Sequence, residues 1–164
     1  MKLTNLKKIK NSIDQSFMDA VRAIVKCRSK VIICGVGKSG LIAAKIASTF
    51  SSVGSPAFSL SANDCLHGDL GSITKKDVLI LISNSGNTEE LKPVIQFANR
   101  NKITLIGIVS KKNSILYNAA DIKLNTTVMP FIIRGIKLWG IDSSGASIKR
   151  REFLWNEAEK LVDF

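Results

Sequence analysis

Val31-Ile-Ile-Cys-Gly-Val-Gly-Lys-Ser-Gly40 is the stretch that decides the fold of this chain. Its first four residues are apolar and mostly β-branched, which predicts a strand buried at the centre of a sheet. The glycines that follow predict a sharp turn, and small and apolar residues from Leu41 to Phe50 predict a helix behind it. A strand that feeds such a turn presents free backbone N–H groups at the start of a helix, where the helix dipole favours an anion. The first hypothesis is therefore a ligand that carries phosphate.

The rest of the chain alternates strands and helices around this unit. Further strands are expected at residues 56–60, 78–82, 103–109 and 122–128, and helices at residues 5–27, from residue 88 onward and at 113–120. Residues 61–77 are rich in glycine and polar side chains, so we expect a loop with one short helical turn. The alternation predicts an α/β fold, a three-layer αβα sandwich with a five-stranded, doubly wound parallel sheet. Ligands of such folds bind at the carboxyl ends of the strands.

Length and composition exclude several classes of protein. The 164 residues suit one domain with an ordinary core. No apolar run approaches the ~20 residues that span a bilayer, and no secretory-type apolar segment follows the N-terminal lysines, so we expect a cytoplasmic protein without membrane contact. Cys27, Cys34 and Cys65 form no C-x-x-C pair and are expected to be reduced, with Cys34 in the core. His67 has too few acidic neighbours on its loop for a metal site, so no metal is expected.

The formal net charge of +11 raises the question of nucleic-acid binding, but its distribution argues against it. Residues 1–30 carry +6 from eight basic and two acidic side chains, whereas residues 31–74 are neutral. The excess avoids the segment with the glycine turn, and no aromatic pattern or zinc-finger spacing accompanies it. We expect solvated basic faces that attract small anions, phosphorylated metabolites among them, and no nucleic-acid partner.

Gly35-Val-Gly-Lys-Ser-Gly40 has the G-x-G-x-x-G form of a dinucleotide-binding turn. Such a site also needs an acidic residue about 20 residues later to hold the ribose, and residues 53–63 contain none. The Gly-Lys-Ser triplet resembles part of a P-loop, but that motif requires a glycine where this chain has Ile32. NAD binding and nucleotide hydrolysis are therefore disfavoured, and no cofactor is expected.

A second turn, Ser83-Asn-Ser-Gly-Asn-Thr-Glu-Glu90, follows the strand expected at 78–82. Ser83, Ser85 and Thr88 supply three hydroxyls, backbone N–H groups surround Gly86, and a helix begins directly behind. A phosphate monoester could be held there without an arginine. The same residues could instead serve only to cap a helix and fill a turn. The residues alone leave these two interpretations open.

Three motifs occur together in this chain: Gly35-Val-Gly-Lys-Ser-Gly40, Leu66-His-Gly-Asp-Leu-Gly71 and Ile82-Ser-Asn-Ser-Gly-Asn-Thr-Glu-Glu90. In this order and with these separations they resemble the sugar isomerase (SIS) domain family, and within it the D-arabinose-5-phosphate isomerases of the Kdo pathway for lipopolysaccharide or capsule. The resemblance implies a reversible interconversion of D-ribulose 5-phosphate and D-arabinose 5-phosphate through an enediolate, without a redox cofactor. It also implies a homo-oligomer, a dimer or a tetramer.

The resemblance also implies roles for single side chains. Lys38 would polarise the carbonyl or stabilise the enediolate, and Glu90 would transfer the proton between C1 and C2 or orient hydroxyls of the sugar. His67 matches the histidine of the family's H-G-D-L-G motif. The expected catalytic residues are Lys38, His67 and Glu90, and the expected substrate-binding residues are Gly37, Ser39, Ser83, Asn84, Ser85, Gly86 and Thr88. Without the resemblance, these three catalytic candidates would be an exposed loop lysine, a structural histidine and an ordinary first-turn helix acid.

The resemblance ends at about Val128. We expect residues 1–128 to form the phosphosugar-binding SIS domain and residues 129–164 an altered, partly helical tail. The family's later glutamate-containing stretch, its His-Pro-Gly-Gly motif and its paired CBS domains have no counterpart in this sequence. Isomerisation needs an acid and a base within reach of the substrate, and the missing motifs would remove part of them. Two functions therefore stay open: a phosphosugar isomerase and a non-catalytic phosphosugar-binding module.

Overall fold

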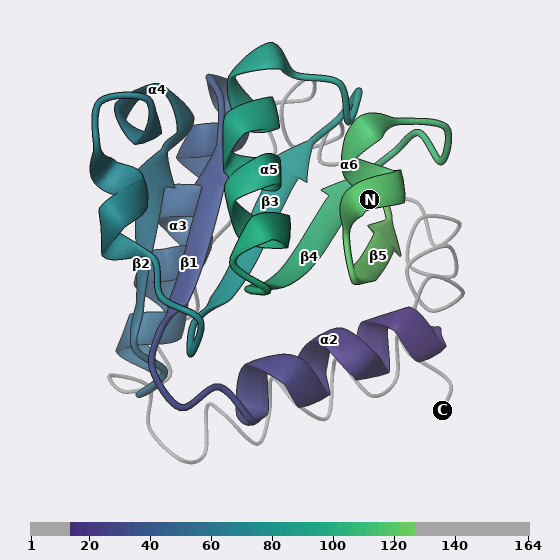
Figure 1. Ribbon diagram of the computed structural model, residues 1–164. Coiled ribbons are helices and arrows are strands. Elements are labelled where there is room, and N and C mark those ends of the chain that lie inside the picture. The colour runs from purple at the N-terminus through teal and green to yellow at the C-terminus, as the bar shows by residue number, and fades with distance from the viewer. Residues whose placement is uncertain (1–13, 127–164) are drawn as a thin grey trace.

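Strands and helices alternate through residues 14–126, the part of the chain that the computed structural model describes (Figure 1). The strands are β1 (Val31–Gly35), β2 (Ala57–Ser61), β3 (Val78–Ser83), β4 (Thr104–Val109) and β5 (Ile122–Asn125). The α-helices are α2 (Gln15–Val25), α3 (Lys38–Ser52), α4 (Ala62–Cys65), α5 (Lys92–Arg100) and α6 (Ile115–Ala119), and two short 3-10 helices are η1 (Asp69–Ser72) and η2 (Glu89–Leu91). None of the helices in this part of the chain is long and apolar enough to cross a membrane. The start of the first expected helix, the boundary at residue 128 and the tail lie outside the described residues.

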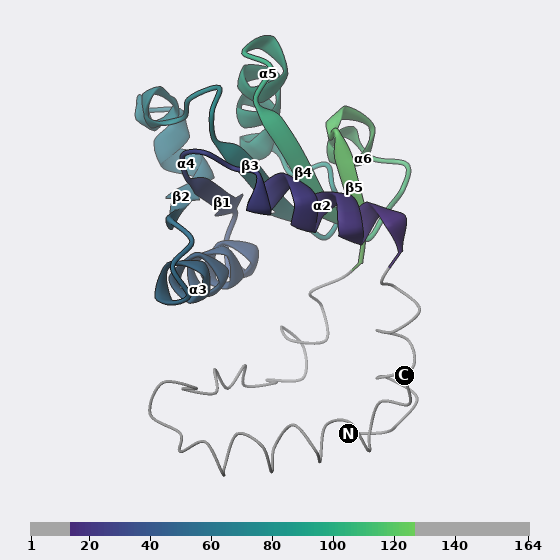
Figure 2. The same ribbon diagram turned by 90° about the horizontal axis from the view of Figure 1, so that it is seen from below.

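All five strands are parallel and follow the order β2-β1-β3-β4-β5, which confirms the predicted doubly wound sheet. In this register Gly35 lies opposite Ser61 on one side and Ile82 on the other. The carboxyl ends of β2, β1 and β3 are therefore level. The chain leaves β1 toward α3 and leaves β3 toward α5, and these helices cover opposite faces (Figure 2). A crevice between such strands is the usual ligand site in this architecture.

The sheet has an apolar layer on each face because side chains alternate along every strand. Ile33 and Ile80 point to the face covered by α2 and α3, where Ala43 and Ala47 are small enough to let α3 lie close. The opposite face is covered by α4, α5 and α6, and its buried residues include Ile32, Cys34, Leu79, Leu81, Val94, Ala98, Leu105 and Leu116. Burial on both faces explains why β1 and β3 are apolar throughout.

The glycine turn is shorter than the sequence predicts, because α3 begins at Lys38 rather than at Leu41. Gly37 has a φ of +56°, a conformation that favours glycine. A Cβ on Gly35 would lie 2.8 Å from the backbone carbon of Ser39, and one on Gly40 would lie 3.0 Å from the carbonyl oxygen of Gly35. Only glycines allow the helix to start this close to the strand end, so the segment is a tight bend.

Several other boundaries differ from the prediction. The strands expected at 56–60, 103–109 and 122–128 are found at Ala57–Ser61, Thr104–Val109 and Ile122–Asn125, and the helix expected at 113–120 is found at Ile115–Ala119. Residues 61–77 contain two short helical segments rather than one. The helix expected at 88 starts as η2, and Pro93 then lies in the first turn of α5, where its missing N–H costs no intrahelical hydrogen bond.

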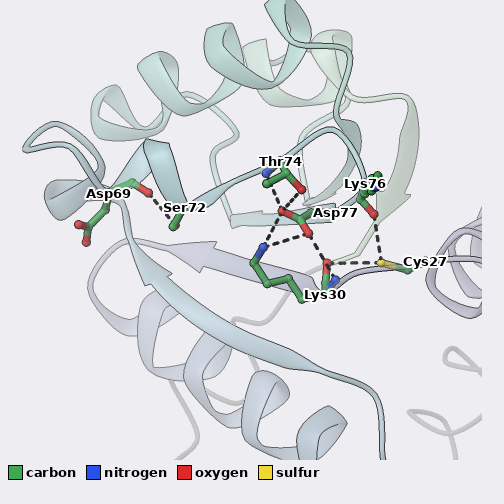
Figure 3. A network of polar contacts seen from close by, with 7 residues as sticks. All are labelled: Cys27, Lys30, Asp69, Ser72, Thr74, Lys76 and Asp77. Carbon is green, nitrogen blue, oxygen red and sulfur yellow. Dashed lines mark hydrogen bonds and ion pairs between the residues drawn. The ribbon is translucent and has the colours of Figure 1, made fainter.

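At the other end of the sheet, a buried carboxylate joins the starts of β1 and β3 (Figure 3). Asp77 receives hydrogen bonds from Thr74 N at 2.6 Å and from Thr74 Oγ1 at 3.0 Å, and its Oδ2 lies 3.0 Å from Lys30 Nζ. Burial alone would raise the pKa of the Asp77 carboxyl, but hydrogen bonds from Ser29, Thr74 and Lys30 outweigh it and lower this pKa below its usual value. Asp77 therefore stays ionised and holds the starts of β1 and β3 together.

Replacing Asp77→Asn is expected to lower the free energy of unfolding at pH 7 by about 2–4 kcal/mol, since the Lys30 ammonium loses its partner. Because the pKa of Asp77 is lowered in the folded state, its stabilisation is present above the ordinary carboxyl pKa and is lost as pH falls through the lowered value. Urea unfolding of both proteins across acidic pH measures this. Asp19→Asn, which removes the charge from an exposed carboxylate that contacts Arg22 and Gln15, is the control and should cost about 0.5 kcal/mol or less. If the wild type and Asp77→Asn differ by the same free energy of unfolding down to the lowest pH, the pKa of Asp77 is not lowered in the folded state.

Candidate active site

Three loops leave the sheet at the carboxyl ends of the adjacent strands β2, β1 and β3. They carry His67, Lys38 and Glu90 respectively. The level register of these strands makes the loops start at one edge, the upper edge in Figure 1. In addition α4 contacts η2, so the segment before His67 lies beside the one that contains Glu90. The structure thus gathers the three sequence motifs at the end of the sheet where ligands bind.

The turn after β3 is organised by its own hydroxyls. Ser83 is only 2% exposed, and its Oγ accepts a hydrogen bond from Gly86 N at 3.0 Å and lies 2.8 Å from Thr88 Oγ1. Ser85 Oγ accepts a hydrogen bond from Asn87 N at 3.2 Å. Such side-chain to backbone bonds are typical of serine and threonine turns. They fix the shape of the turn from within.

This hydrogen bonding leaves donors for a ligand. The Ser83 oxygen already accepts from Gly86 N, so its proton can be donated to Thr88 Oγ1, and the Thr88 proton is then available. A hydroxyl that accepts one hydrogen bond also donates more strongly. Ser85 and Thr88 are half-buried and not fully enclosed. Ser83 therefore lies beneath the turn as its support, and Ser85 and Thr88 are the hydroxyls that a ligand can reach.

Gly86 is the point at which the turn packs against the rest of the protein. Its φ is +69°, and a Cβ at this position would collide with the Ser114 side chain and with Val109 Cγ2. Gly86 O also accepts a hydrogen bond from Leu116 N at 2.9 Å. Glycine is thus required twice, for the backbone conformation and for the close approach to the β4–α6 loop.

The three expected catalytic side chains lie on the segments that follow β1, β2 and β3. Lys38 is exposed at the first position of α3, next to Gly37 and the half-buried Ser39. His67 is exposed between α4 and η1, and Glu90 is half-buried in η2. Within residues 14–126, no hydrogen bond or ion pair engages the side chains of these three residues, whereas the adjacent Glu89 pairs with Lys92 at 2.6 Å. No partner among the described residues therefore fixes the orientation of these side chains.

The sequence interpretation missed the contribution of the β4–α6 loop. Ser110 and Ser114 contact the turn, and Asn87 links the turn to α6. One signal was present: a polar run, Ser110-Lys-Lys-Asn-Ser114, directly follows the apolar strand β4. Because β4 is the neighbour of β3 in a parallel sheet, this run had to lie beside the 83–88 turn.

Two cysteines contact each other between β1 and α4. Cys34 and Cys65 are both buried, which confirms Cys34 as a core residue. A hydrogen bond from the Cys34 thiol to Cys65 raises the pKa of Cys34, and burial acts in the same direction. The same bond lowers the pKa of Cys65. This contact ties the end of β1 to α4. Among the described residues, no group of three or more His, Cys, Asp or Glu side chains could hold a metal ion.

Comparison with protein families identifies the fold. The model of the SIS domain matches residues 23–140. The chain belongs to the SIS domain family. Arabinose 5-phosphate isomerase KdsD of Francisella tularensis is 43% identical over 131 residues, which are 78% of this chain and 40% of the relative. KdsD of Yersinia pestis is 46% identical over 112 residues, 68% of this chain and 34% of the relative.

The SIS chain thus spans two fifths or less of the length of these two curated relatives. A solved structure of the c3406 protein of E. coli CFT073, in complex with arabinose 5-phosphate, superposes with a TM-score of 0.66 and 38% sequence identity. The match covers 73% of this chain and 65% of that chain. The resemblance and the parallel α/β fold expected from the sequence are both confirmed.

Replacing Gly86→Ala is expected to destabilise the protein by about 2–4 kcal/mol, because the new Cβ meets Ser114 and Val109 and the φ is unfavourable. Thermal or urea unfolding measures the loss. Gly71→Ala is the matched control, since a Cβ there has nothing within 4 Å, and should be close to neutral. Equal stability of the two variants would show that Gly86 is not packed as described.

Proposed function

We propose that this chain is a phosphosugar isomerase that interconverts D-ribulose 5-phosphate and D-arabinose 5-phosphate. The observation that carries the proposal is the 83–88 turn. It carries three hydroxyls at the carboxyl end of β3, and the segments with Lys38 and His67 start at the same edge of the sheet. The identity to relatives named arabinose 5-phosphate isomerase supports the choice of reaction.

In this proposal the phosphate is bound by neutral donors. Ser85 and Thr88 donate from their hydroxyls, together with backbone N–H groups of the turn and of the first turn of η2, which have no intrahelical acceptor. Ser83, Asn84 and Gly86 shape the turn, and Gly37 and Ser39 bring the start of α3 over the sugar. Lys38 adds a positive charge near the site without an ion-pair partner among the described residues.

The chemical step is proton transfer between C1 and C2. In the proposed mechanism the Glu90 carboxylate removes the proton from the carbon next to the carbonyl, which leaves an enediolate. Lys38 stabilises the negative charge that develops on oxygen, and His67 moves the proton between the two oxygens. Return of the proton from Glu90 to the neighbouring carbon completes the isomerisation without a redox change or a cofactor.

The setting that we propose is the supply of a precursor for lipopolysaccharide or capsule. We further propose that the protein acts in the cytoplasm as a homo-oligomer, in which neighbouring copies could complete each other's sites. An oligomer of this kind would supply acid or base groups beyond Lys38, His67 and Glu90.

A second candidate function is phosphosugar binding without turnover. The observation that favours it is a contrast: internal hydrogen bonds hold the turn in shape, whereas within residues 14–126 no hydrogen bond orients the side chains of the three catalytic candidates. Binding needs only the turn, whereas catalysis needs the acid and base to be held within reach of the substrate.

Replacing Glu90→Gln is expected to lower kcat by about 10²–10⁴-fold with little change in KM, because the base is removed and the phosphate contacts remain. The reaction is followed by NMR in D₂O with D-ribulose 5-phosphate, so that deuterium incorporation reports proton removal directly. Glu89→Gln is the matched control: this carboxylate is adjacent and pairs with Lys92, and its loss should leave kcat unchanged.

Turnover by the wild type that survives Glu90→Gln would exclude Glu90 as the base. Binding of the phosphosugar without turnover or deuterium incorporation would favour the binding module. Absence of binding would exclude both functions.

A further inference from the structure

The 83–88 turn is braced from one side by the loop between β4 and α6. Ser110 Oγ donates to Asn84 O at 2.6 Å, Leu116 N donates to Gly86 O at 2.9 Å, and Ile115 N donates to Asn87 Oδ1 at 2.9 Å. These three hydrogen bonds hold successive parts of the turn and together form a brace for it. The two bonds that involve side chains join residues that are 26 and 28 positions apart in the sequence.

Asn87 has two functions within this brace. Its side chain accepts from the first N–H of α6, a group that has no acceptor inside the helix. Its own backbone N–H donates to Ser85 Oγ at 3.2 Å. Because the Ser85 oxygen accepts this bond, the Ser85 proton is free to be donated to a ligand. Asn87 thereby couples the position of α6 to the orientation of the Ser85 hydroxyl.

Ser110 acts at the other end of the turn. It is the residue directly after β4, and its bond to Asn84 O fixes the peptide group between Asn84 and Ser85. The β4 end is itself held, since Asn125 Nδ2 donates to Val109 O and to Ser110 O, both at 3.0 Å. The brace therefore rests on the sheet and not on a second loose loop.

We propose that Asn87 and Ser110 are positioning residues for the phosphate, an inference that rests on the proposed binding of a phosphosugar at this turn. Neither side chain needs to touch the ligand. They hold the Ser85 hydroxyl and the backbone N–H groups in the bound geometry before the ligand arrives, so that less order has to be created on binding. Donors held in this way bind more tightly than the same donors on a mobile loop.

The brace predicts a specific pattern of effects. Asn87 is exposed, so water can replace its bond to Ile115 N, and Asn87→Ala should change the melting temperature little. The affinity for the phosphosugar should nevertheless fall about 5–10-fold, and KM should rise by the same factor while kcat stays within about twofold. A residue that served only stability would show the reverse.

The test measures Kd for D-arabinose 5-phosphate with the full chain by calorimetry, and KM and kcat where there is turnover. The variants are Asn87→Ala, Ser110→Ala, Ser110→Thr and Ser83→Ala, with Asn118→Ala as the control, because Asn118 is exposed on α6 outside the brace. Asn87→Ala and Ser110→Ala should weaken binding, Ser110→Thr should restore it through its hydroxyl, and Asn118→Ala should bind like the wild type.

The possible failures are distinguishable. If Ser83→Ala weakens binding but Asn87→Ala and Ser110→Ala bind like the wild type, the brace has no role and the proposed function stands. If Asn87→Ala and Asn118→Ala weaken binding equally, the effect belongs to α6 as a whole and the positioning role is overturned. If the wild type does not bind D-arabinose 5-phosphate, both the proposed function and the brace are wrong.

Discussion

The candidate site depends on the register of three parallel strands, which brings their carboxyl ends to the same level. Gly35 lies opposite both Ser61 and Ile82, so the loops after β2, β1 and β3 begin at the same height. Shifting one strand by a residue would move its loop along the sheet and exchange its side chains between the two apolar layers. The Asp77–Lys30 pair secures this register from the opposite end, where β1 and β3 begin.

In the proposed site, small residues would take the place of the charged residues that bind phosphate in many proteins. Gly35 and Gly40 let α3 start against the strand, and Gly86 lets the turn lie on Ser114. The resulting backbone is close-packed and hydrogen-bonded from within, with hydroxyls as the outward donors. Preorganised donors of this kind suit a phosphate monoester on a neutral sugar, because the donors need not move when the ligand binds.

Much of this arrangement was predictable from the sequence, because buried parallel strands are apolar throughout and small residues mark the turns behind them. The order of the strands was not predicted, whereas the residues of both turns follow β1 and β3 as expected. The starts of helices were less predictable. Helix α3 begins at Lys38 and not at Leu41, because the bend is already complete at Gly37. Contacts between distant segments, such as Asn87 with Ile115 or Cys34 with Cys65, depend on side-chain packing that no local pattern encodes.

We propose that the 83–88 turn, and not the glycine turn at 35–40, holds the phosphate. Amide chemical-shift mapping of the ¹⁵N-labelled full chain, titrated with D-arabinose 5-phosphate and in parallel with D-arabinose, tests it most directly. If the phosphate binds at the 83–88 turn, saturable changes in amide chemical shift will centre on Ser85, Asn87, Thr88 and Glu89. They will occur with D-arabinose 5-phosphate and not with D-arabinose. Shifts centred on Gly35–Gly40, or equal responses to the two sugars, would contradict it.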